Sequence, residues 1–247
     1  MSIAPALLRR PWRGVEQTSW LLGLIFAILF AGIRVAGIFG GRAWQPMLPA
    51  GFIFMTLLPW ILLTGQGRRE IGWQWPTDRR VYGMACLVGI GAAFACFLLG
   101  LALFGRSGQN WYVSIADYYR RSLDTTGFGL GRLHLTFTLP AMLLSPFGEE
   151  IFFRGVLQRL LEQRFSQRAS TFAEASFFGL VHLCHHGVTP GPFLLLPSAP
   201  LWVLLMAITA WLFAWLRKSS GSLAPAILAH ALFNLTMNVC IFAALWA

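Results

Sequence analysis

Charged residues are scarce in this sequence. Only 11% of the 247 residues are Asp, Glu, Lys or Arg, whereas about 25% are charged in a typical soluble domain. Hydrophobic residues make up 57% of the chain, and the mean hydropathy is +0.64. This composition excludes a water-soluble globular protein. It predicts a single integral membrane domain over residues 1–247, embedded in a lipid bilayer, with no separate soluble domain.

Acidic residues are especially few. Nine Asp and Glu stand against 19 Lys and Arg, which gives a net charge of +10. The basic residues are spread between apolar runs, so they fit membrane orientation better than nucleic-acid binding. Their bias toward one side of the alternating spans predicts a cytoplasmic N-terminus. Because no eukaryotic-looking targeting feature is present, we expect a multi-pass protein of a bacterial inner (cytoplasmic) membrane.

Cysteine and sequence repeats are also scarce. Three of the four cysteines lie inside apolar runs and no two have metal-ligand spacing, so we interpret them as small buried apolar residues. The zinc-protease motif His-Glu-x-x-His is absent. No internal repeat is visible, which argues against a transporter built from inverted repeats.

Long apolar runs dominate the chain and predict an all-α fold. We expect a polytopic transmembrane helical bundle of about eight helices, including short or broken ones, around an intramembrane cavity. Glycine and alanine in the third run permit close helix packing. A short interfacial helix is expected at about 111–119, in the longest polar connection. The expected spans are residues 20–33, 47–64, 81–104, 133–147, 169–183, 200–216 and 223–246.

One stretch places two adjacent carboxylates between apolar segments. Pro146 and Gly148 precede Glu149 and Glu150, which predicts a helix that begins there with both acids in its first turn. Glu150 and Arg154 are four residues apart and can pair on one face. Glu149 is rotated by about 100° and should face a different partner. In a soluble protein, a capping acid and a surface ion pair would be the simplest interpretation.

A few other polar side chains fall in apolar helices. His182 lies near the end of the fifth span, and His230 and Asn234 are four residues apart on the last span. A single buried His or Asn is more often a satisfied core residue. However, each charged group facing lipid costs roughly 2.5–3.5 kcal/mol, so three helices that each carry such groups predict one internal site. We expect Glu174 to snorkel to the cytoplasmic edge and His185 to lie in an outer loop.

Three short motifs in a fixed order carry a family resemblance: Glu149-Glu150-x-x-x-Arg154, Phe178-x-x-x-His182 and His230-x-x-x-Asn234. They resemble the motifs of the CAAX-protease and bacteriocin-processing family of intramembrane glutamic endopeptidases, which includes the prenyl-protein CAAX endopeptidase. The resemblance covers roughly residues 140–238. The first motif alone is a weak signal, whereas the ordered set makes coincidence improbable.

The resemblance implies a mechanism of peptide hydrolysis. Glu149, supported by His182, would be the general base on water, and His230 with Asn234 would donate hydrogen bonds to the oxyanion. Glu150, paired with Arg154, would be structural. Glu149, His182 and His230 also resemble a zinc ligand set. We prefer the glutamic mechanism, which needs no metal or other cofactor.

The predicted function is therefore an intramembrane endopeptidase acting on a membrane-associated protein or peptide. The substrate classes are prenylated CAAX tails, leader peptides and C-terminal membrane anchors, of which the prenylated tail is least expected in a bacterium. The alternative is a non-catalytic immunity or partner-binding protein on the same scaffold, which would not require all of the polar groups together. A small transporter with a proton relay is a further alternative.

Overall fold

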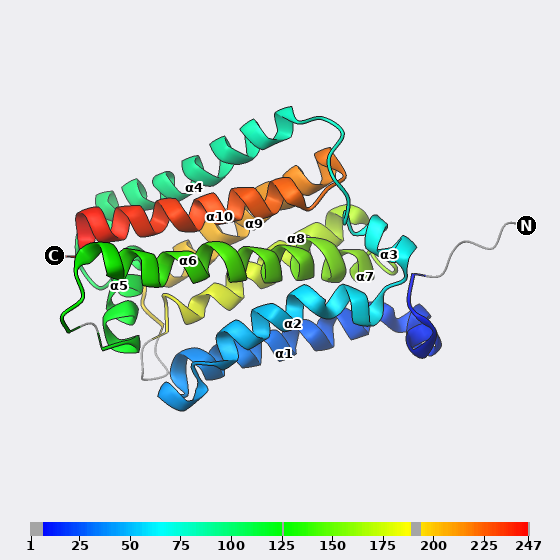
Figure 1. Cartoon of the computed structure of the whole chain (residues 1–247), viewed down its shortest axis with the longest axis horizontal. Helices are drawn as coiled ribbons and strands as arrows, with labels where there is room; N and C mark the ends of the chain where they lie inside the picture. The colour runs from blue at the N-terminus through cyan, green and yellow to red at the C-terminus, as the bar shows by residue number, and fades with distance from the viewer. Residues whose placement is uncertain (1–6, 125, 189–193, 247) are drawn as a thin grey trace, which may run out of the picture.

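The computed structural model describes residues 7–124, 126–188 and 194–246, and these residues form a bundle of helices (Figure 1). No named strand occurs in these three segments; two isolated bridges are the only β pairing. Five of the described helical segments are long and apolar enough to cross a membrane. The all-α, multi-pass architecture predicted from the apolar runs is thus confirmed.

The helical segments used below are, in chain order, α1 (Ser19–Phe39), α2 (Met47–Leu62), α3 (Gly65–Glu70), α4 (Arg80–Phe104), α5 (Trp111–Ser122), α6 (Leu130–Glu149), the π-segment (Glu150–Leu157), α7 (Gln158–Leu161), α8 (Gln167–Val181), α9 (Ser198–Ser220) and α10 (Ala224–Cys240).

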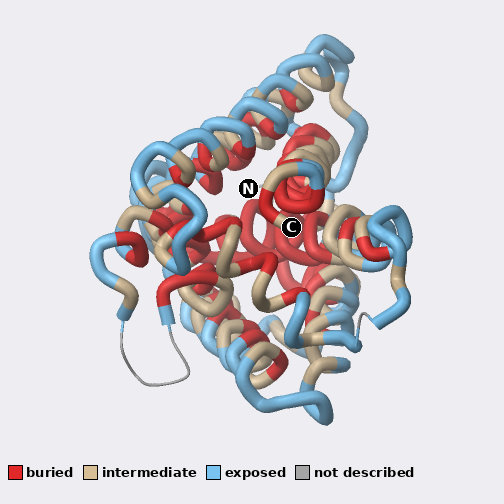
Figure 2. The backbone as a smooth tube through the Cα atoms, turned by 90° about the vertical axis from the view of Figure 1, so that its left-hand side faces the viewer, coloured by how far each residue is buried: buried red, intermediate tan, exposed pale blue. Residues whose placement is uncertain are grey.

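The long helices run alongside one another between two ends of the bundle (Figure 1). The N-terminal end holds the start of α1, the short helix α3 and the turn between α9 and α10. The far end holds α5 and the C-terminus. Figure 2 shows that buried backbone lies at the centre of the bundle and exposed backbone lies around it, as expected for helices with lipid on the outside.

Helix α10 packs against α4, α6 and α9. The contact with α4 depends on a glycine, because a Cβ atom at Gly89 would lie only 2.2 Å from the carbonyl oxygen of Ala229. This contact confirms the close packing expected of the third apolar run. On the outer face of α6, Leu135, Leu139 and Leu143 are 50–57% exposed, which is the pattern of a lipid-facing surface.

The predicted helix start at Pro146 and Gly148 is wrong. Helix α6 begins well before these residues and continues through the π-segment into α7, so Glu149 and Glu150 lie in the middle of a long helix. A proline removes one backbone donor, and packed membrane helices tolerate that loss. Gly148 serves a helix contact instead, because a Cβ atom there would lie 2.7 Å from the carbonyl oxygen of Phe52 on α2.

The short helix expected at about 111–119 is present as α5. The Asn110 side chain accepts a hydrogen bond from the Tyr112 backbone N–H (3.0 Å), which caps the helix. Trp111 and Tyr112 are completely buried, and the Tyr112 hydroxyl donates to the carbonyl of Ala93 on α4 (2.8 Å). Helix α5 is therefore fixed against the bundle at its far end.

Candidate active site

The six residues predicted to form the site come from three parts of the bundle. Glu149 ends α6, Glu150 and Arg154 lie in the π-segment, His182 follows α8, and His230 and Asn234 lie on α10. All are buried: the two acids and the arginine are 0% exposed, and the histidines and the asparagine are 4–8% exposed. The widened helical turn of the π-segment directly follows Glu149, and such turns are frequent at functional sites.

Glu150 joins Arg154 to His230. Its Oε2 atom lies 3.1 Å from Arg154 Nε, which confirms the pairing predicted from the four-residue spacing. Its Oε1 atom lies 2.7 Å from His230 Nδ1. If this carboxylate is ionised it can only accept, so Nδ1 carries the hydrogen. The ring is thereby oriented with its Nε2 atom toward Glu149, 3.9 Å from Oε2 of that residue.

Glu174 also belongs to this buried cluster, so the prediction that it snorkels to the membrane edge is wrong. It is completely buried, and its Oε1 atom lies 3.4 Å from Arg154 Nε. Its position in the middle of α8 and on the inward face brings it to an internal cation. The Arg154 guanidinium also lies over the Phe178 ring, 4.1 Å from its centroid, so two carboxylates and an aromatic face surround one buried charge.

Arg34 is the site residue that the sequence reasoning missed. Its Nη1 atom donates to Glu149 Oε1 at 2.6 Å, between side chains that are 7% and 0% exposed. The predicted first span ended at Ile33, whereas α1 continues to Phe39 and carries Arg34 inside it. The sequence did offer one signal for this residue: Arg34 is a lone arginine with apolar residues on both sides. Glu149 thus faces a different cation from Glu150, as its rotation predicted.

His182 is held by the backbone rather than by Glu149. Its Nδ1 atom lies 2.7 Å from the Phe178 carbonyl oxygen, and Trp202 Nε1 donates to the His182 carbonyl at 3.0 Å. A carbonyl only accepts, so Nδ1 carries the hydrogen and a neutral ring has Nε2 as its acceptor. Within the described segments, no hydrogen bond or ion pair joins His182 directly to Glu149.

A cavity of about 390 Å³ lies beside these residues, and we call it the central cavity. Arg34, His182, His230 and Asn234 are in its wall, which is otherwise largely apolar and includes residues of α2, α5, α6 and α9. Glu149 stands behind the wall, within 2.6 Å of Arg34 and 3.9 Å of His230. The contributions of α5 and the first turns of α2 place the cavity toward the far end. Its volume lies in the usual range of ligand sites.

Asn234 links α10 to α6 across the cavity wall. Its Nδ2 atom donates to the Ala141 carbonyl at 2.7 Å. A side-chain amide has two N–H donors, so this bond fixes the amide and uses one of them. Asn238, one turn further on α10, is completely buried and accepts a hydrogen bond from the Tyr119 hydroxyl at 3.0 Å.

His185 was expected in an outer loop, but it lines the central cavity. A short 3-10 turn, His182–Cys184, follows α8 and leads to His185. His185 Nε2 lies 3.5 Å from Arg34 Nη2, and its ring centroid is 5.4 Å from that of His182. The next residue, His186, instead bridges the hydroxyls of Ser114 and Ser198, each at 2.8 Å, and so connects α5 to α9.

The described side chains of the site are not grouped as a set of metal ligands. One oxygen of Glu149 is bound by Arg34, whose positive charge opposes a second cation nearby. The Nδ1 atoms of His182 and His230 donate to other groups, so Nε2 is the only ring nitrogen of each that could bind a metal. In the part of the chain that the structure describes, no group of three His, Cys, Asp or Glu side chains is placed to hold a metal ion, and the four cysteines are free.

A family model matches the part of the chain that carries this site. The model, described as type II CAAX prenyl endopeptidase Rce1-like, matches residues 131–236. No match was found among curated proteins or among solved structures. The matched region contains all three motifs and extends from α6 to α10, and it lies in a multi-pass helical bundle. Fold and family together support a membrane-embedded protease. The match over residues 131–236 supports the resemblance to the CAAX-protease family that the three motifs predicted.

Proposed function

We propose that the protein is a glutamic intramembrane endopeptidase in which Glu149 activates a water molecule beside the central cavity. One observation carries this proposal. Glu149 is completely buried, Arg34 binds its Oε1, and its Oε2 has no hydrogen-bond partner among the described residues. An unsatisfied buried carboxylate oxygen is costly. A water or substrate group bound there during the reaction would offset that cost.

In the proposed step, Glu149 Oε2 accepts a proton from water while the water oxygen attacks the peptide carbonyl carbon. The proton then passes to the leaving nitrogen as the carbon–nitrogen bond breaks. His182 Nε2, the acceptor nitrogen of the neutral ring, would hold the second hydrogen of this water. His182 and Glu149 then cooperate through the water, which agrees with the lack of direct contact between them.

The oxyanion needs donors on the opposite side of the carbonyl. Asn234 supplies its second amide N–H, because its first is bound to the Ala141 carbonyl. His230 lies one turn away on the same helix, with Nδ1 held by Glu150. When His230 carries both ring protons, Nε2–H donates to the oxyanion and its charge stabilises the tetrahedral intermediate.

We assign supporting roles to the remaining charged residues. Glu150, Arg154 and Glu174 form the buried cluster that fixes the π-segment and orients His230. Arg34 is a positioning residue: its guanidinium binds Oε1 of Glu149 and leaves Oε2 to accept the proton.

We propose a cytoplasmic N-terminus in a bacterial inner membrane. The N-terminal end of the bundle is rich in basic residues, including those of α3 and the start of α4, and this is the positive-inside pattern. A cysteine introduced as R69C should then be protected from an impermeant thiol reagent in intact cells, and one introduced as R106C should react. The reverse labelling would overturn this orientation.

The proposed orientation in the membrane determines from which side a substrate would reach the central cavity. The central cavity lies toward the far end, which would face outward. A cut on the outer side fits the C-terminal anchor of an exported protein better than a CAAX tail, which is presented in the cytoplasm. The cavity of about 390 Å³ and its apolar wall fit one extended segment of such an anchor.

The test compares membrane peptide termini in a deletion strain that carries the wild type, Glu149→Gln or Glu162→Gln. Glu162 follows α7 outside the site and serves as the matched control. We expect a membrane protein to accumulate uncleaved with Glu149→Gln and to be cleaved with the other two. Cleavage by Glu149→Gln at the wild-type rate would refute the glutamic mechanism. Identical termini in every strain, the deletion included, would favour the non-catalytic alternative.

A further inference from the structure

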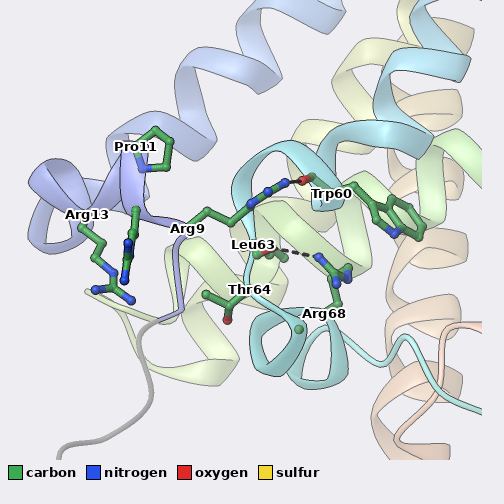
Figure 3. A pocket seen from close by; sticks show the side chains of 9 residues that line it. Arg9, Pro11, Arg13, Trp60, Leu63, Thr64 and Arg68 are labelled. Carbon is green, nitrogen blue, oxygen red and sulfur yellow. Dashed lines mark hydrogen bonds between the residues drawn. The ribbon is translucent and has the colours of Figure 1, made fainter.

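A second cavity, of about 450 Å³, lies at the N-terminal end of the bundle (Figure 3). We call it the arginine pocket, because its wall contains Arg9, Arg10, Arg13 and Arg68. The first three precede α1 and the fourth lies in α3, so chain segments on either side of the first two membrane spans build it. It shares no wall residue with the central cavity.

Hydrogen bonds hold the two segments together. The Arg9 backbone N–H donates to the Leu62 carbonyl at 2.8 Å, and the Arg9 guanidinium donates to the Trp60 carbonyl. Within the second segment, Arg68 Nη1 donates to the Leu63 carbonyl at 3.0 Å. Figure 3 shows these two guanidinium groups reaching the end of α2 from opposite sides. The pocket is therefore preorganised and is more than a set of mobile surface chains.

The charge of the pocket is not balanced by acids. None of its four arginines forms an ion pair with any residue that the structure describes. Glu16, the acid of the segment before α1, accepts a hydrogen bond from the Leu7 backbone N–H (2.9 Å) and is not in the pocket wall. Arg10 and Arg13 are exposed. Guanidinium groups that have no acidic partner are the usual binders of phosphate groups.

The surroundings indicate the source of that phosphate. A 3-10 segment, Arg10–Thr18, leads from the pocket into α1, and α2 ends at the pocket. The pocket therefore lies where two membrane spans leave the hydrocarbon region. Trp60 and Leu63 form an apolar wall, and tryptophan is typical of the membrane–water interface. We infer that the arginine pocket binds the phosphate headgroup of an anionic phospholipid, with the acyl chains along the apolar wall. This inference does not depend on the proposed protease mechanism.

The test uses the purified full-length chain in detergent and measures binding of phosphatidylglycerol, with phosphatidylcholine as the zwitterionic control. The variant is R10Q/R13Q, which removes two pocket charges without removing a hydrogen bond that holds the pocket together. Its matched control is R79Q/R80Q, which removes two exposed charges at the start of α4, outside the pocket. Each basic side chain near an anionic headgroup strengthens binding about 5-fold. We expect R10Q/R13Q to weaken binding about 25-fold and R79Q/R80Q to bind like the wild type.

Several results would overturn the inference. Equal weakening by both double variants would show only a diffuse charge effect. Equal binding of phosphatidylglycerol and phosphatidylcholine would show that the arginines do not select an anion. Displacement of the lipid by millimolar inorganic phosphate, with the same loss in R10Q/R13Q, would assign the pocket to a soluble phosphate compound instead.

Discussion

Replacing Arg154 by methionine tests the structural role of the buried cluster. Its guanidinium is completely buried, 3.1 Å from Glu150 and 3.4 Å from Glu174. Methionine occupies much of the same space but leaves both carboxylates without their cation. Removing one partner from a buried ion pair costs about 3–5 kcal/mol. At roughly 2–4 °C per kcal/mol for a chain of this size, the unfolding midpoint should fall by about 6–20 °C.

The assay is thermal unfolding of the purified protein in detergent, and Arg159→Met is the matched control. Arg159 lies five residues further along the same helix and pairs with Glu70 at 2.7 Å, but both side chains are 26% exposed. Such a partly exposed pair contributes about 0–1 kcal/mol. The double variant R154M/E174Q should recover part of the loss, because one stranded carboxylate becomes a neutral amide. Equal midpoints for Arg154→Met and Arg159→Met would refute the structural role.

Three further outcomes are expected once a substrate is available. Arg34→Ala should lower kcat about 100-fold by misplacing Glu149, with partial recovery in Arg34→Lys; an unchanged kcat would show that Arg34 has no positioning role. Asn234→Ala should lower kcat about 10²- to 10³-fold at constant KM, and a rise in KM alone would instead assign Asn234 to substrate binding. Activity should persist after dialysis against a strong chelator, with no stoichiometric metal in the protein. Recovery of lost activity in proportion to bound zinc would contradict the metal-free mechanism.

The helical bundle could be predicted because its main constraint is local. A helix must be long and apolar enough to cross the bilayer, and backbone groups must be satisfied within it, so apolar run length identified five spans. The runs expected as spans at 133–147 and 169–183 lie mainly in α6 and α8, which are not among the five described helices that are long and apolar enough. The Glu150–Arg154 pair could also be predicted from a local constraint, because residues four apart lie on one face of a helix.

The sequence-based predictions failed where contacts between residues far apart in the chain determine the structure. Pro146 and Gly148 locally favour a helix start, but packing against α2 makes them part of a continuous helix. Glu174 could be placed on a helical face, but nothing in α8 alone shows that this face is turned toward Arg154. The partner of Glu149 lies 115 residues away on α1, and no local spacing predicts it. The catalytic roles of Glu149, His182, His230 and Asn234 stay predictions.

The Arg34–Glu149 pair has a consequence for how the protein is made. Helix α1 is synthesised long before α6. Arg34 therefore enters the membrane before its partner, the Glu149 carboxylate, has been made. An unpaired arginine at the centre of a span costs about 2.5–3.5 kcal/mol. Arg34 lies close to the end of α1, and its long side chain can reach the headgroup region until Glu149 arrives. We therefore expect the depth of α1 in the membrane to be fixed only after α6 is inserted.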